Sequence, residues 1–380
     1  MVNTDRVINE FLELVQVDSE SGAERQLADL LKARLTDLGL EVREDNAGSY
    51  IEVGQTTGNI IGTLPANGGK GPLLLLSAHM DTVKPGKGVQ PRRENGRIIA
   101  SGDTILGSDD KAGIVAILEA LRVVKENQLR HGGIEVVFTI AEEMGLVGAK
   151  GLDYDLIQSK LGFVLDSGGA PGEIIVKAPT QYSFKATVKG KAAHAGIAPE
   201  QGINAIVVAS SAITKLKLGR IDNETTANIG SISGGLATNI VPEKVTIEGE
   251  ARSINPVKAK DQIEHMKEEF AKAAAHYEAH VDIEVIKQYD HIDLAADSLP
   301  VRIALKAAEN ADIKPHLGQT GGGSDANVFN GRGIACANLG IGMSKVHTTE
   351  EFITEEHLVQ NANYVVEIIK TAQEVVAFSH

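Results

Sequence analysis

Short apolar runs that end in polar side chains recur along the chain. Residues 73–78 (Leu-Leu-Leu-Leu-Ser-Ala) lead into His79 and Asp81. A continuous apolar run of this length is typical of a strand buried on both faces of a parallel sheet. Side chains at i and i+2 of an extended chain point to the same side, so His79 and Asp81 are expected to face one way. Such a pair is a candidate metal ligand with the carboxylate that orients it.

Two later strands follow the same rule. Residues 134–140 precede Glu142 and Glu143, and residues 161–165 precede Asp166. Apolar residues elsewhere recur at helical spacing. This spacing predicts helices within 4–38, with a break at 19–22 and a stop at Gly39, and over 114–125, 300–309 and 358–378. Alternating strands and helices predict an α/β fold with a mostly parallel mixed sheet flanked by helices. Sites in such sheets form beyond the carboxyl ends of the strands.

The pattern changes at Pro179, where strands begin to alternate as half-exposed elements. We expect strands in 182–188, 227–232, 244–251 and 281–286, and helices in 203–218 and 257–275. The order β-α-β-β-α-β is that of a ferredoxin-like α+β domain. The predicted division is therefore a discontinuous catalytic domain, 1–178 and 291–380, with an inserted domain at 179–290.

Composition narrows the class of protein. The 380 residues carry 37 basic and 51 acidic side chains, a net charge of −14, which argues against a nucleic-acid partner. Cys336 is the single cysteine, lies in an apolar context that predicts burial, and cannot form an internal disulfide. No apolar run is long enough to span a bilayer, and the N-terminus has no secretory pattern. These features predict a cytoplasmic protein with no membrane partner.

Carboxylate and imidazole side chains, which can bind metal ions, follow the predicted strands. To those already named, the Gly-bounded turn 107–113 adds Asp109 and Asp110, and a late loop adds His347. So many carboxylates at one sheet edge would repel one another unless cations neutralised them. Oxygen and imidazole ligands suit Zn²⁺, Mn²⁺ or Co²⁺ better than Ca²⁺.

Five such ligands serve two metals only if one carboxylate bridges them. Asp109 or Asp110 is the natural bridge, because both lie in the turn 107–113 before a helix. Adjacent side chains on extended backbone diverge, so one of Glu142 and Glu143 can bind metal while the other serves as general base.

These motifs resemble those of the dinuclear zinc peptidases, the family that includes peptidase T, carboxypeptidase G and succinyl-diaminopimelate desuccinylase, and the likeness is greatest to peptidase T. The matching segments occur in the family's order and span nearly the whole chain: His79-Met-Asp81, Gly107-Ser-Asp-Asp-Lys-Ala-Gly113, Glu142-Glu-Met-Gly145, Asp166-Ser-Gly168, Ala193-His-Ala-Gly196, Gly321-Gly-Gly-Ser-Asp325 and Val346-His347.

The resemblance implies two Zn²⁺ ions per subunit. One ion would take His79, Asp109 and Asp166, and the other Asp109, Glu143 and His347. Asp81 would orient His79. Glu142 would be the general base that activates a metal-bridging water. A cis peptide bond is implied at Asp109–Asp110.

The inserted domain would be a lid that also forms a homodimer. There, the resemblance implies that His194 polarises the scissile carbonyl and that Asn239 and Arg252 bind substrate and its carboxylate. Gly321 and Gly322 would offer backbone N–H groups to the substrate.

The implied activity is removal of the N-terminal residue from short peptides, as in a tripeptidase. Two alternatives stay open: a deacylase or carboxypeptidase acting on N-acyl amino acids or dipeptides with the same metals, and a non-catalytic protein that keeps the fold. The residues after His347, Thr-Thr-Glu-Glu-Phe, differ from the corresponding loop of peptidase T.

Overall fold

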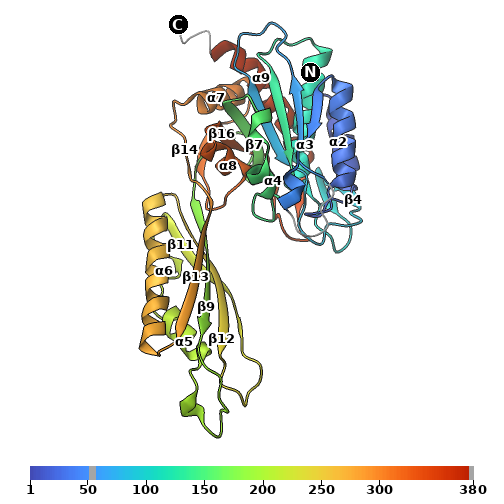
Figure 1. Cartoon of the computed structure of the whole chain (residues 1–380). Helices are drawn as coiled ribbons and strands as arrows, with labels where there is room; N and C mark the ends of the chain where they lie inside the picture. The colour runs from blue at the N-terminus through green and yellow to red at the C-terminus, as the bar shows by residue number, and fades with distance from the viewer. Residues whose placement is uncertain (51–56, 376–380) are drawn as a thin grey trace. The chain divides into compact units, whose positions relative to one another are not determined.

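The computed structural model describes residues 1–50 and 57–375 of the chain. These residues form two compact units. The larger unit takes the chain up to Val176, Asp293–Gln319 and the part from Ser324 onward, and the smaller unit takes Lys177–Ile292 and Thr320–Gly323. The larger unit contains the first and last described residues (Figure 1).

A central mixed sheet organises the larger unit. Its strands follow the order β1 (Glu41–Glu44), β2 (Ile60–Leu64), β6 (Ile134–Thr139), β3 (Leu74–His79), β7 (Leu161–Ser167), β16 (Ala335–Gly340), β8 (Glu173–Ala178) and β14 (Ile292–Asp293), and β15 (His316–Gln319) pairs with β8. The four middle strands, β6, β3, β7 and β16, run parallel, while β1, β2 and β8 add antiparallel pairs at the edges.

Apolar side chains explain why these strands lie in the middle of the sheet. Every residue of β3 and of β6 is buried, as expected for strands covered on both faces. The prediction of a mixed α/β fold with a helix-flanked sheet is confirmed.

Helices flank the sheet. α3 packs on β3 and β7, α7 on β7 and β16, and α8 on β7 and β16. The helices of this unit are α1 (Thr4–Val15), α2 (Arg25–Leu38), α3 (Ser108–Glu126), α4 (Val147–Gly151), α7 (Leu299–Asn310), α8 (Asp325–Gly331) and α9 (Glu355–Val375), with 3₁₀ turns at Ala47–Tyr50 and Tyr154–Leu156. α2 ends at Gly39, whose φ of 96° places it in the left-handed region that glycine adopts without strain.

Some elements differ from the prediction. A three-stranded sheet, β17 (Phe352–Thr354), β5 (Arg97–Ala100) and β4 (Pro91–Glu94), was not expected, because its strands are only three or four residues long and carry no long apolar run. α3 begins at Ser108, six residues before the predicted start. The last predicted helix begins three residues early, at Glu355, and the end predicted for it, residues 376–378, lies outside the described residues.

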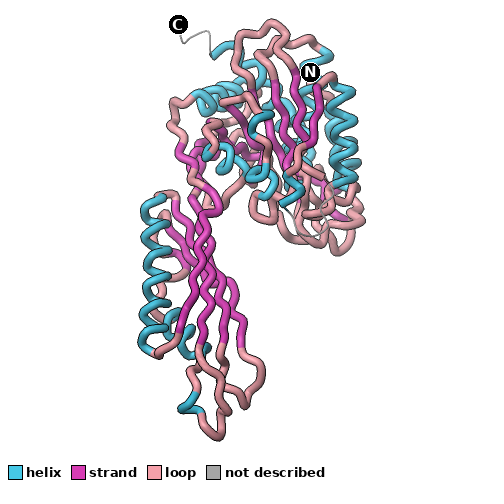
Figure 2. The backbone as a smooth tube through the Cα atoms, viewed as in Figure 1, coloured by secondary structure: helices cyan, strands magenta, loops and turns pink. Residues whose placement is uncertain are grey.

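The smaller unit is a five-stranded antiparallel sheet with two helices on one face (Figure 2). The strand order is β10 (Gly219–Arg220), β11 (Thr225–Gly234), β12 (Lys244–Ser253), β9 (Thr180–Lys189) and β13 (His280–Tyr289). Without the short β10, this is the ferredoxin-like order. α5 (Ala205–Ile213), shorter than the predicted helix, and α6 (Pro256–His276) enclose a separate apolar core, and a 3₁₀ turn spans Pro199–Gln201.

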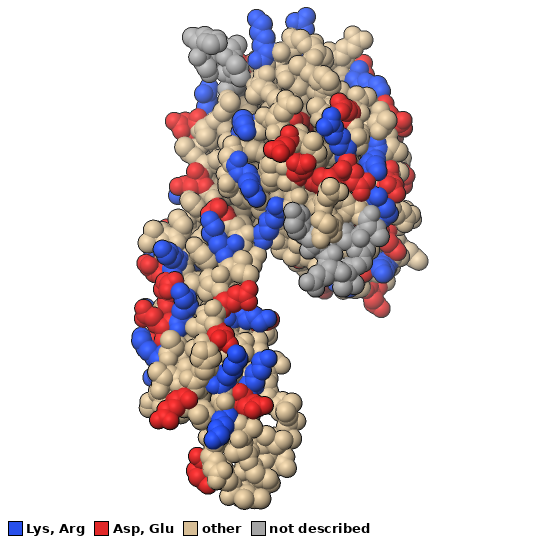
Figure 3. All heavy atoms as spheres, viewed as in Figure 1, with Lys and Arg blue, Asp and Glu red and all other residues tan. Residues whose placement is uncertain are grey.

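Surface charge and helix hydrophobicity were compared with what a nucleic-acid or membrane partner would require. Lys and Arg side chains are interspersed with Asp and Glu over the face drawn in Figure 3, without a continuous basic patch on that face. Within residues 1–50 and 57–375, no helix has an apolar stretch long enough to cross a membrane.

Candidate metal centre

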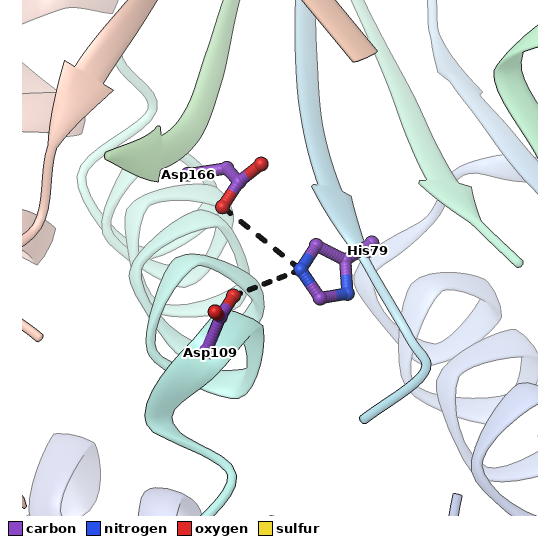
Figure 4. Close-up of side chains that lie close together, drawn as sticks. All are labelled: His79, Asp109 and Asp166. Atoms are coloured by element: carbon purple, nitrogen blue, oxygen red, sulfur yellow. Dashed lines mark hydrogen bonds and ion pairs between the residues drawn. The ribbon is translucent and has the colours of Figure 1, made fainter. Parts of the chain in front are cut away.

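Three side chains of the larger unit, two at strand ends and one at the start of a helix, point toward one another (Figure 4). His79 ends β3, Asp166 lies near the end of β7, and Asp109 lies at the start of α3. The Nε2 atom of His79 is 2.9 Å from Asp109 Oδ1 and 3.9 Å from Asp166 Oδ1. The parallel order β6-β3-β7 is what brings these strand ends to a single edge.

Asp109 also faces a second group of side chains. Its other oxygen, Oδ2, lies 3.3 Å from Nε2 of His347, and the same Nε2 is 2.8 Å from Glu143 Oε1. One carboxylate thus presents one oxygen to each of two neighbouring groups, which is the geometry that a bridging ligand requires.

The potential ligand atoms lie close together. Two groups, His79–Asp109–Asp166 and Asp109–Glu143–His347, each place three ligand atoms within 4.8 Å of one another. A third group of the same kind joins His79, Glu142 and Glu143. All five residues that the sequence indicated as metal ligands therefore lie in two groups that share Asp109, and Glu142 lies beside them.

The backbone around Asp109 departs from helical geometry. Asp109 and Asp110 have non-helical φ and ψ inside α3, and the peptide bond between them is cis. Asp110, the other candidate bridge, belongs to none of the three groups. Its Oδ2 accepts the His79 backbone N–H at 3.1 Å and its Oδ1 accepts that of Gly113 at 3.2 Å. Asp110 therefore joins α3 to the end of β3.

Burial and neighbouring charges shift the pKa values of the side chains in this site. Burial raises the pKa of Glu142 well above its ordinary value, and the nearby charge of Asp166 raises it further. Burial would lower the pKa of His79, but hydrogen bonds with Asp109 and Asp81 raise it. Hydrogen bonds with Asp109 and Glu143 raise the pKa of His347 to about 10. The surrounding carboxylates thus favour positive charge at this site.

That preference fits divalent cations. Buried carboxylate oxygens and imidazole nitrogens are ligands that Zn²⁺, Mn²⁺ and Co²⁺ accept. Protons on the imidazoles balance part of the negative charge here, and bound cations would replace those protons. The donor set therefore fits two metal ions, and its chemistry does not distinguish zinc from manganese or cobalt.

Asp81 has more contacts than the sequence indicated. Its backbone oxygen lies 2.9 Å from His79 Nδ1 and its carboxylate Oδ1 lies 3.4 Å from the same atom. The carboxylate also accepts the backbone N–H groups of Glu142, at 2.8 Å, and Glu143, at 3.2 Å. Asp81 thus contacts a predicted ligand on β3 and the loop that carries both glutamates.

Two residues behind Asp81 were missed by the sequence reasoning. Ser21 donates from Oγ to Asp81 Oδ2 at 2.6 Å, and Glu24 accepts the Ala141 N–H at 3.1 Å. The sequence predicted only a break between helices at 19–22, and α2 starts after Glu24. Burial and the charge of Asp81 raise the pKa of Glu24 to about 7. The only sequence signal was several polar residues packed into a short break.

Asn338 was also missed. Its side-chain Oδ1 accepts the Asp166 backbone N–H at 3.0 Å, and its Nδ2 donates to the Asp166 carbonyl at 2.9 Å. The side-chain amide thereby takes the place of a backbone hydrogen bond between β7 and β16, where the register shifts between Asn338 and Gly340. A polar residue inside an apolar strand was the available signal.

Other predicted site residues belong to the smaller unit. His194 is exposed, and its Nδ1 accepts the backbone N–H groups of Gly196 and Ile197, each at 3.2 Å. Asn239 lies on the adjacent segment, where its carbonyl accepts the Ala195 N–H at 3.0 Å. The structure therefore brings His194 and Asn239 to neighbouring loops of this unit.

Arg252 already holds a carboxylate of the chain itself. Its Nε and Nη2 donate to Glu250 at 2.8 and 2.9 Å, while Nη1 lies 3.4 Å from the Gly321 carbonyl. The Gly322 N–H donates to Thr320 Oγ1 at 3.1 Å, so this amide is already paired. A Cβ at Gly321 would meet no atom within 4 Å.

The fold and the site define a metal-dependent hydrolase: two ligand groups share a carboxylate at the carboxyl edge of a parallel sheet, with a further buried carboxylate beside them. The sequence pattern of peptidase family M20/M25/M40 matches residues 75–371. The chain belongs to this family and is a metallopeptidase that hydrolyses peptides.

Relatives along the full length agree with this assignment. The structure of aminopeptidase PepT from Bacillus cereus is 47% identical, with a TM-score of 0.90, over 98% of this chain and 99% of that chain. A tripeptidase structure from Staphylococcus aureus is 41% identical, with a TM-score of 0.93, over 98% and 100%. Peptidase T of Escherichia coli (strain K12) is 27% identical over 97% of this chain and 99% of the relative.

Proposed function

We propose that the protein is a dinuclear aminopeptidase that removes the N-terminal residue from short peptides, tripeptides above all. The observation that carries the proposal is Asp109, whose two oxygens face His79 and His347 in two separate ligand groups. Two relatives that are 47% and 41% identical, an aminopeptidase and a tripeptidase, support the choice of substrate.

Two zinc ions would be held by the residues already grouped. His79, Asp109 and Asp166 would hold one, and Asp109, Glu143 and His347 the other. Ions held there would polarise the scissile carbonyl and lower the pKa of the attacking water. The five ligands also suit Mn²⁺ or Co²⁺.

Glu142 is proposed as the general base. Its side chain is buried beside both ligand groups, and its backbone N–H is held by Asp81. Glu142 would accept a proton from the attacking water and return it to the leaving amine. The group formed by His79, Glu142 and Glu143 also makes Glu142 a possible ligand, so loss of turnover with metal retained is the result that assigns the base.

Residues of the smaller unit would bind the substrate. We propose that His194 polarises the scissile carbonyl, that Asn239 hydrogen-bonds the peptide, and that Gly321 offers its N–H group. Arg252 would bind the substrate carboxylate through Nη1, since Glu250 holds its other edge. Because the Gly322 N–H is already paired with Thr320, Gly322 would contribute by leaving room for the peptide. In these roles the inserted domain serves as the lid of the site.

The smaller unit is also the proposed homodimer contact. Beyond Ala227, the outer edge of β11 has no strand partner among the described residues. Ile232 and Leu236 are exposed there, at 52% and 87%, beside a cavity of about 380 Å³. An unpaired edge with exposed apolar side chains fits a second copy placed edge to edge. Light scattering of Leu236→Asp would show a monomer, whereas an unchanged mass would exclude this contact.

We propose that the protein is cytoplasmic. The single cysteine, Cys336, is fully buried and has no second cysteine to pair with, which suits a reducing compartment.

A peptide panel with metal analysis tests the function. Protein purified without chelators is expected to contain two ions per chain and to release the first residue of tripeptides. N-acetylated tripeptides should be left intact. Cleavage that requires the acyl group would replace this proposal with a deacylase or carboxypeptidase. No cleavage of any substrate by protein with two bound ions would support a non-catalytic role.

A further inference from the structure

A buried carboxylate outside the ligand groups holds the segment that leads into Asp109. Glu351 is 2% exposed. Its Oε2 accepts the backbone N–H groups of Leu106 at 2.8 Å and Gly107 at 2.9 Å. Its Oε1 accepts the Ser108 hydroxyl at 2.6 Å and the Asp109 N–H at 3.1 Å. A single side chain thus binds four consecutive residues.

Glu351 belongs to the loop that carries His347. Reciprocal backbone hydrogen bonds of 3.0 Å between Ser344 and Phe352 close this loop. Within it, the Glu351 N–H donates to the Thr348 carbonyl at 3.1 Å, so the carboxylate and His347 share one short turn. The loop therefore contacts the Asp109 segment twice, once through His347 and once through Glu351.

These two contacts have different chemical consequences. His347 and Asp109 are both proposed ligands of the same ion, and their separation depends on how the two segments are held. The four hydrogen bonds of Glu351 hold them without using any ligand atom. A carboxylate is suited to this task because it only accepts, and all four groups facing it donate.

We propose that Glu351 is a positioning residue that sets the separation of Asp109 and His347, and with it the affinity of the ion that these two residues share with Glu143. The inference rests on the proposed metal roles of Asp109 and His347. It predicts that loss of Glu351 weakens the ion held by His347 more than the other, because both ions share Asp109 but only this one takes a ligand from the 344–352 loop. Residues that hold ligands in place typically contribute about 10–100-fold to metal affinity.

The neighbouring residue provides a matched control. Glu350 is exposed and pairs only with Lys345 and Thr348 of its own loop among the contacts seen in the described residues. Glu350→Gln and Glu351→Gln make the same chemical change at adjacent positions. In Glu351→Gln, the new amide N–H₂ would face N–H donors, so at least one of the four hydrogen bonds is lost.

The experiment is calorimetric titration of metal-free protein with Zn²⁺, together with kcat and KM. Wild type and Glu350→Gln are expected to bind two ions equally well. Glu351→Gln should bind the ion held by His347 about 10–100-fold more weakly and the other ion with a clearly smaller loss, and kcat should fall more than KM rises. Excess Zn²⁺ should restore part of kcat.

Two other outcomes would overturn the proposal. One is unchanged affinity for both ions in Glu351→Gln, and the other is equal weakening of both, which marks a general loss of structure. If Glu351→Gln does not fold, Ser108→Ala, which removes one donor, decides the question by the same criteria. Wild type that binds no metal would instead refute the proposed function itself.

Discussion

The Oδ1 atom of Asp81 accepts the backbone N–H of Glu142 at 2.8 Å. Asp81 follows β3 and Glu142 follows β6, which are parallel neighbours in the sheet. The contact holds the proposed base beside the ligand groups while the backbone carbonyl of Asp81 accepts from His79. Through its carbonyl and its carboxylate, Asp81 therefore links the position of a metal ligand to the position of the base.

Asp81→Asn should damage both metal binding and turnover. The amide would place N–H₂ against one of the groups that now donate to Asp81, which are the N–H groups of Glu142 and Glu143 and the Ser21 hydroxyl. We expect metal affinity to fall about 10–100-fold, with a comparable loss of kcat. Ser21→Ala keeps the carboxylate and should have a smaller effect in the same direction. An Asp81→Asn enzyme with wild-type kcat would contradict this assignment.

Glu142→Gln should keep both ions and lose turnover. Glutamine preserves the size of the side chain but cannot accept the proton, so kcat should fall about 10²–10⁴-fold. Metal content after dialysis gives the second measurement. Glu143→Gln is the matched comparison at the adjacent residue, and it should lose one ion because its oxygen faces His347. If Glu142→Gln lost metal instead, Glu142 would be a ligand.

Metal affinity should increase with pH. Hydrogen bonds with Asp109 and Glu143 raise the pKa of His347 to about 10 in the metal-free protein, so a cation must displace a proton below that pH. The apparent affinity of the ion held by His347 should rise by up to about tenfold per pH unit between roughly pH 7 and pH 9. In His347→Gln, this ion should bind weakly at every pH. A flat profile in the wild type would show that His347 is not displaced.

Glu24→Gln should stabilise the metal-free protein at alkaline pH. Burial and Asp81 raise the pKa of Glu24 to about 7 from an ordinary 4.5, so between these values the unfolded state ionises while the folded state keeps the proton, and the free energy of unfolding falls as pH rises. The variant avoids this loss, which is about 3 kcal/mol at most.

Urea unfolding across this range measures the difference. The difference in the free energy of unfolding between variant and wild type should be absent at pH 4, increase up to pH 7 and stay constant above pH 7. Glu24→Ala provides the contrast, because it removes the acceptor of the Ala141 N–H and should destabilise the protein at every pH. A Glu24→Gln variant less stable than wild type at pH 8 would contradict the expected charge effect.

Much of the candidate site could be predicted from local sequence. The apolar runs of β3, β6 and β7 marked buried strands, and His79, Glu143 and Asp166 follow or end those strands. Burial and periodicity are properties of a short segment, because side-chain direction alternates along a strand and repeats along a helix. A parallel sheet then places successive strand ends at one edge, so the ligand set followed from local patterns and one general rule.

The tertiary structure decided which atoms meet. Ser21 reaches Asp81 across 60 residues, Asn338 pairs with Asp166 across 172, and Glu351 binds Ser108 across 243. No periodic pattern encodes these pairs, because they depend on the strand order and on how loops pack behind the sheet edge. The sequence alone therefore determined the buried strands, the chemistry at their ends and the family. Only the three-dimensional packing selected the polar residues that hold those ends in place, since a buried hydrogen bond forms wherever the folded chain brings donor and acceptor together.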